Sequence, residues 1–235
     1  MNNAVNNIPL INLLWVFSLT LGVIIIYACW SIKVGNIVYG TLRMLVQLIL
    51  IGYFLTYIFE SGNPFIVVGL LGAMLVIASS IALRPIRIKR KGLYLKVLTA
   101  ISTGGGLTLG LVVFGVLELE PWYEPHYILP LAGMIFANSM NAASLAAERF
   151  ETEIKRGGDY FEARSIALKA ALIPLTNLFF AVGLVSLPGM MTGQILSGIS
   201  PLLAARYQIM VMCMIFGSAG ISSALYLTLL KKEVM

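Results

Sequence analysis

Seven apolar runs divide the chain, and each is long enough to cross a lipid bilayer. A span takes roughly 20 residues, because a helix rises about 1.5 Å per residue through a hydrocarbon core about 30 Å thick. Lipid offers the backbone no hydrogen-bond partner, so runs of this length must be helices. The predicted spans are Ile8–Trp30, Val38–Phe59, Pro64–Leu83, Val97–Leu117, Tyr127–Ala147, Ala170–Leu187 and Tyr207–Leu230.

Composition supports an all-α, polytopic transmembrane bundle. Only 11% of the 235 residues are charged, whereas a soluble domain carries roughly 25%. No linker or repeat interrupts the chain, so residues 1–235 are predicted to form one transmembrane domain. The first run lacks a basic leader and is expected to remain as a helix. Cys29 and Cys213 lie within apolar runs and are interpreted as small buried residues rather than a disulfide.

Lysine and arginine set the predicted orientation. Basic residues gather in one set of loops: Lys33, Arg84, Arg87, Lys89, Arg90, Lys91, Lys96, Arg149, Lys155, Arg156, Arg164, Lys169, Lys231 and Lys232. The other set holds Glu60, Glu118, Glu120 and Glu124, with Arg206 as its basic residue. Basic loops stay cytoplasmic, so the N-terminus is predicted outside and the C-terminus inside, which requires an odd number of spans. Such clustering also argues against a nucleic-acid surface.

Polar side chains within two spans are candidates for a substrate path. Arg43 and Gln47 share one face of the second span, where the arginine either reaches toward the interface or faces inward. The fifth span carries a polar arc made of Met134, Asn138, Asn141 and Ser144, continued by Glu148. This arc serves either as hydrogen-bonding glue between helices or as a face toward substrate.

Glycine and proline mark two further segments. In the fourth span, Gly106 and Gly110 have the spacing that lets helix backbones approach, although a hinge is the alternative. Residues 188–206 begin with Pro188-Gly189 and are too apolar for an exposed loop, which favours a re-entrant or interfacial turn on the outer side. This segment is predicted to include a short helix over Gln194–Ile199, followed by Ser200 as the N-cap of the next helix, which begins at Pro201. Met190 and Met191 there are either soft metal ligands or apolar fillers.

Residues 148–169 form the longest polar stretch. At its centre Gly157 and Gly158 precede Asp159, a suitable helix N-cap. The residues that follow mix aromatic and charged side chains: Tyr160, Phe161, Glu162 and Arg164. The stretch is either a solvated connector or a short helix at right angles to the spans, suited to the groove of a partner.

Several chemistries are excluded. The chain has no G-x-x-x-x-G-K-[ST] phosphate loop and thus no such ATP site. Its single histidine, His126, and its lack of mid-membrane Asp or Glu exclude a di-aspartate protease, a histidine-rich metal site and a carboxylate proton relay. An enzyme is therefore not predicted, and no cofactor is expected.

Particular residues resemble the FetB-type ABC transporter permeases, which include a bacterial iron-export permease and plant aluminium-tolerance proteins. The specific stretch is Leu187-Pro188-Gly189-Met190-Met191-Thr192-Gly193. Supporting matches lie at Ala170–Pro174, at Ala205–Ile209, and in the second and fifth spans through Arg43, Gln47, Leu48, Ile51, Gly52, Tyr53, Ile128, Pro130, Ala132, Gly133, Met134, Ile135 and Asn138. The resemblance covers nearly the whole chain.

This resemblance implies a permease subunit of the bacterial inner membrane that pairs with a separate ABC-type ATPase and forms a homodimer. It implies export of iron or of another metal or metal-related solute by alternating access. Coupling would pass through the stretch around Gly157–Arg164. The residues just before it, Glu151–Arg156, depart from the family because they are more charged. The alternatives are a self-sufficient channel or secondary carrier, and a membrane scaffold. The residues identify no metal ligand set.

The orientation can be tested with reporter fusions. Fusions after Lys91 and Lys232 are expected to report a cytoplasmic location, because basic residues flank both sites. A fusion after Glu120 is expected to report the opposite side. A cytoplasmic signal at Glu120 would contradict the predicted orientation.

Overall fold

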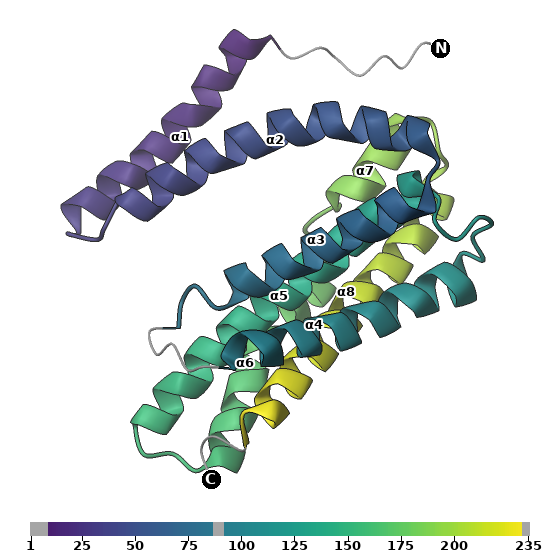
Figure 1. The fold of residues 1–235 in the computed structure, drawn as a ribbon. Coiled ribbons are helices and arrows are strands. Elements are labelled where there is room, and N and C mark those ends of the chain that lie inside the picture. The colour runs from purple at the N-terminus through teal and green to yellow at the C-terminus, as the bar shows by residue number, and fades with distance from the viewer. Residues whose placement is uncertain (1–8, 87–91, 232–235) are drawn as a thin grey trace. The chain divides into compact units, whose positions relative to one another are not determined.

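The computed structural model describes residues 9–86 and 92–231, and these form helices and short connections. The helices are α1 (Leu10–Cys29), α2 (Gly35–Ser61), α3 (Pro64–Ala82), α4 (Leu93–Gly110) with a π-helical end (Leu111–Val116), α5 (Pro125–Lys155), α6 (Tyr160–Ala181), α7 (Gly189–Leu196) and α8 (Pro201–Leu229) (Figure 1). Within the described ranges, seven helices are long and apolar enough to span a membrane. The predicted all-α class and span count are confirmed.

The chain divides into two compact units, and the first ends at Ser61. It contains α1 and α2, joined by a turn in which Ser31 has a left-handed φ of 56°. Among its described side chains Ile58 alone is buried. These helices therefore present apolar side chains outward along their length, as lipid-facing helices do.

The second unit, from Gly62 onward, is built around α5 and α8. The α5 helix packs against α3, α4, α6 and α8, and α8 also contacts α4, α6 and α7 (Figure 1). The 31 residues of α5 give it a length of about 46 Å, more than the roughly 30 Å of hydrocarbon that it must cross. The charged residues of α5 gather at its C-terminal end, from Glu148 to Lys155, so we expect that end to project from the bilayer.

Glycines let α4 approach its neighbours, but at other positions than predicted. A Cβ on Gly104 would overlap Ser222 Oγ and would lie 2.8 Å from the Ser222 backbone nitrogen. One on Gly105 would lie 3.0 Å from the ring of Phe136. Nothing lies within 4 Å of the corresponding points on Gly106 and Gly110, so the predicted pair of contact glycines is wrong. The spacing marked a suitable face, whereas the packing uses the adjacent one.

The predicted connector at 148–169 is mostly helical. The α5 helix continues to Lys155 and α6 begins at Tyr160, so the stretch forms a helical hairpin with a four-residue turn. It contains no separate short helix at right angles to the spans, which was one of its two interpretations. The span limits had followed apolarity, but a helix can continue into water when charged side chains pair along it. The Asp159 N-cap is confirmed, because its carboxylate accepts a hydrogen bond from the Phe161 N–H at 2.9 Å.

The segment around α7 also differs from prediction. The α6 helix ends at Ala181 instead of Leu187, and α7 spans Gly189–Leu196 instead of 194–199. Pro188 does not stop a helix here but precedes α7 as its N-cap residue, where a missing N–H costs nothing. The Ser200 cap before Pro201 is confirmed. Cys29 and Cys213 are both exposed, so their predicted burial is wrong.

The close contact of α4 with α8 can be tested by adding a single methyl group. Gly104→Ala is expected to lower the stability of the folded chain by about 1–3 kcal/mol, since its Cβ would meet backbone atoms that cannot swing aside. The measurement is thermal unfolding in detergent. Gly106→Ala is the matched control and should unfold like the parent. Equal behaviour of the two variants would contradict the proposed contact.

Candidate functional site

A pocket of about 460 Å³ lies between α5, α7 and α8, and we call it the α5–α8 pocket. It brings together two predicted path residues, Met134 on α5 and Met190 on α7. The remaining lining residues are Leu117, His126, Tyr127, Pro130, Leu131, Gln194, Ile199, Leu203, Tyr207 and Met210. Its donor atoms are thus thioethers, phenol hydroxyls, an imidazole and an amide within an otherwise apolar wall.

Helix geometry directs the polar groups of this pocket. Met190 and Gln194 are four residues apart on α7 and so share its inner face. The Gln194 Oε1 atom is buried and has no hydrogen-bond partner among the described residues. At the start of α5, His126 Nδ1 lies 2.8 Å from Glu124 Oε1. The pocket therefore offers a buried amide acceptor, with an imidazole–carboxylate pair at the beginning of α5.

The other predicted path residues do not converge on this pocket. Asn138 donates from Nδ2 to the Met134 carbonyl oxygen at 2.8 Å, so its amide is bound within its own helix. Asn141 is exposed and Ser144 is half-buried, and neither lines the pocket. Met191 lines a different cavity, between α6 and α8.

Two predicted path residues belong to the other unit. Arg43 is half-buried and Gln47 is exposed, and both lie on α2. Both residues therefore belong to the first unit.

Five lining residues of the α5–α8 pocket with polar or sulfur-containing side chains were missed by sequence reasoning: His126, Tyr127, Gln194, Tyr207 and Met210. In the sequence, His126 stands out only as the single histidine of the chain. The predicted bounds placed Gln194 and Tyr207 at the starts of their helices, whereas α7 begins at Gly189 and α8 at Pro201. The sequence feature that could have indicated this pocket is the run of methionines at Met210, Met212 and Met214, which places thioether groups on several faces of one helix.

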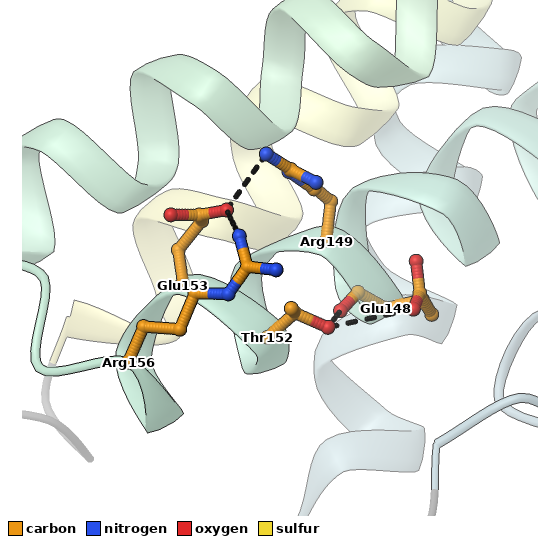
Figure 2. Close-up of polar contacts among 5 residues, drawn as sticks. All are labelled: Glu148, Arg149, Thr152, Glu153 and Arg156. Carbon is orange, nitrogen blue, oxygen red and sulfur yellow. Dashed lines mark hydrogen bonds and ion pairs between the residues drawn. The ribbon is translucent and has the colours of Figure 1, made fainter.

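The opposite end of the second unit is the α5–α6 hairpin tip, residues 148–164. Gly157 adopts a left-handed φ of 86°, which lets the chain leave α5. Figure 2 shows Glu153 between two arginines: its Oε1 atom lies 2.8 Å from Arg149 Nη2 and 3.3 Å from Arg156 Nη1. Thr152 donates to the Glu148 carbonyl oxygen at 3.0 Å. These pairs hold the projecting end of α5 helical.

Tyr160 and Phe161 have opposite roles at this tip. Tyr160 is 3% exposed, stacks edge-on against Phe150 and donates its hydroxyl to the Leu227 carbonyl oxygen at 3.0 Å. It therefore joins α5, α6 and α8 and is not available to a partner, which corrects its prediction as a docking residue. Phe161 is 50% exposed, and the cations of Arg164 and Lys231 lie 5.2 and 5.5 Å from its ring centroid.

Comparison with known proteins identifies the family. Residues 10–235 match the family described as "Uncharacterised protein family (UPF0014)". The chain belongs to UPF0014. No solved structure matches the chain.

Relatives within UPF0014 come from bacteria and plants. The chain is 37% identical over 196 residues to "UPF0014 membrane protein slr1647" of Synechocystis, covering 77% of this chain and 76% of the relative. It is 33% identical over 211 residues to "Probable iron export permease protein FetB" of Escherichia coli, covering 82% and 80%. It is 32% identical over 204 residues to "Protein ALUMINUM SENSITIVE 3" of Arabidopsis thaliana, covering 80% and 73%.

The ligand chemistry of this UPF0014 chain is defined by its side chains. Within residues 9–86 and 92–231, no group of three or more His, Cys, Asp or Glu side chains is placed to hold a metal ion. The α5–α8 pocket instead combines soft thioether donors with neutral polar groups. A solute there would be recognised through its shape, its polar edges and soft contacts rather than by a carboxylate cage.

Proposed function

We propose that this chain is the permease subunit of an ABC transporter that exports iron, or another metal or metal-related solute, across a bacterial inner membrane. A separate ATPase subunit would supply the energy, and two copies of the chain would form the permease. The observation that carries the proposal is the 33% identity over 211 residues to the E. coli protein named as a probable iron export permease. The multi-pass fold supports it, since seven candidate spans are present in the described chain.

The substrate path in this proposal includes the α5–α8 pocket. The pocket has the size and the mostly apolar wall of a small-solute site, with a few polar groups that would fix orientation. The candidate path residues are Arg43, Gln47, Met134, Asn138, Asn141, Ser144, Met190 and Met191, to which the pocket adds Gln194. The exposed amide of Asn141 would face a second permease copy or the path between the two copies.

ATPase coupling in this proposal takes place at the α5–α6 hairpin tip. The candidate residues are Gly157, Gly158, Asp159, Phe161, Glu162 and Arg164. Phe161 is an exposed aromatic ring flanked by two cations. A complementary surface would be an apolar pocket with an acidic rim. The ion pairs along α5 would make the tip stiff enough to transmit a push from the ATPase.

The path is tested by a change in the α5–α8 pocket. The assay is iron(II) export by the permease–ATPase complex in vesicles. Gln194→Leu is expected to lower the transport rate by about tenfold, because it removes a buried polar group that would contact the solute. Leu196→Ala is the matched control on the same helix, where the side chain is 65% exposed and lies outside the pocket. A transport rate like the parent's in Gln194→Leu would remove this pocket from the path.

Coupling is tested by truncating one aromatic side chain. Phe161→Ala is expected to weaken pull-down of the ATPase by about 1–3 kcal/mol and to lower substrate-stimulated ATP hydrolysis, since a docking anchor is lost. Phe65→Ala is the control, because Phe65 is 85% exposed at the start of α3, on the side predicted to face outward. If Phe161→Ala binds and stimulates like the parent, coupling occurs elsewhere. Transport by the chain without any ATPase would instead favour a self-sufficient carrier.

A further inference from the structure

A second cavity lies on another side of α8, between the end of α6, α7 and α8, and we call it the α6–α8 pocket. It has a volume of about 380 Å³. The two neighbouring methionines of α7 divide between the cavities, Met190 toward the α5–α8 pocket and Met191 toward this one. The other residues of the α6–α8 pocket are Phe179, Val182, Gly183, Ala205, Gln208, Ile209, Met212 and Cys213.

Three sulfur atoms and one unpaired amide oxygen belong to this lining. Met191 comes from α7, whereas Met212 and Cys213 come from α8. Gln208 is 6% exposed, and its Oε1 atom has no hydrogen-bond partner within the described part of the chain. An amide oxygen buried in an apolar wall without a partner costs free energy, which indicates that something else satisfies it.

The donor set selects a class of ligand. Thioether and thiolate sulfurs are soft donors that favour Cu(I), and a glutamine oxygen is known as a weak additional ligand at copper sites. Hard divalent cations need carboxylates, and the described lining residues carry no charged side chain. A monovalent cation bound to one thiolate is neutral overall, which an apolar pocket within the membrane tolerates far better than a net charge.

The surroundings fit such an ion. Phe179 in the pocket wall contacts Phe216, with ring centroids 4.8 Å apart and ring planes tilted by 42°, so the wall includes an aromatic ring. Cys213 is exposed and also lines a third cavity of about 340 Å³ that contains Met210 and Met214. Methionine alone is a common apolar filler. Here sulfur-containing side chains from two helices line the same cavity as a buried amide oxygen without a partner. Packing of an apolar gap alone would not require that oxygen.

We propose that the α6–α8 pocket binds a soft monovalent cation of the Cu(I) or Ag(I) class through Met191, Met212 and Cys213, with the Gln208 amide oxygen as a weaker fourth donor. Binding forms a sulfur–metal bond at Cys213 as its S–H bond breaks, and the proton is released to solvent without any change of oxidation state. The site lies in a cavity that shares no lining residue with the α5–α8 pocket, although Met191 is also a candidate path residue of the proposed function. Binding of the ion by the isolated chain therefore tests the site separately from transport.

The test is metal binding by the whole purified chain in detergent, without nucleotide or ATPase. Ag(I) is the redox-inert probe, followed by anaerobic Cu(I) in competition with a chromogenic chelator. The parent is expected to retain one ion per chain and to show sulfur scatterers in its X-ray absorption spectrum. Cys213→Ser and Met212→Leu are each expected to weaken binding by about tenfold or more, and Gln208→Leu by a smaller factor.

Matched controls separate this site from general sulfur content. Cys29→Ser alters the other exposed cysteine and Met44→Leu alters an exposed methionine of α2, and both residues lie in the first unit and outside the lining of this cavity. Both should bind like the parent. Met191→Leu, a conservative change of a half-buried residue, should weaken binding even if a core variant misfolds. The proposal fails if the parent retains no Ag(I) or Cu(I), if Met191→Leu binds normally, or if the controls lose as much affinity as the site variants.

Discussion

The second unit depends on backbones that approach one another without intervening side chains. Lipid is as apolar as leucine, so helices in a membrane gain little from hiding apolar surface and must associate by close packing. Gly104 meets this requirement directly, since even a methyl group there would overlap the Ser222 backbone. Rows of buried alanine meet it elsewhere: Ala142, Ala143, Ala146 and Ala147 on α5, and Ala163, Ala167 and Ala171 on α6.

The α5–α8 pocket and the α6–α8 pocket both adjoin α7, where this close packing gives way. With eight residues, α7 is only about 12 Å long and cannot fill the space beside two long helices. Large and flexible methionines contribute to both cavity linings near it, Met134, Met190 and Met210 in one and Met191 and Met212 in the other. Methionine adapts its shape to irregular gaps and offers a polarizable sulfur. The methionines that fill this looser packing therefore also supply the donor atoms.

Sequence patterns predicted the membrane fold well and the candidate site only in part. Span count and helix type follow from apolar run length, because a bilayer imposes one thickness on every helix. Helix ends were less accurate because charge pairs extend α5 beyond the lipid to Lys155. The buried role of Tyr160 had no sequence signal, since its neighbour Phe161 has the same aromatic character. Which of them faces inward depends on the register of α6 against α8, a property of the assembled bundle.

The contact made by Tyr160 bears on how the two ends of the unit communicate. The α5 and α8 helices both run from the α5–α8 pocket to the hairpin tip, carrying Met134 and Tyr207 at one end, and Phe150 and Leu227 at the other (Figure 1). Tyr160 joins the tip to both helices. A force applied at Phe161 in the proposed transporter would therefore move α5, α6 and α8 together, because a buried hydrogen bond and an aromatic stack resist separation. The pocket would change where α7 meets this rigid group, since α7 is short and connected on both sides by turns.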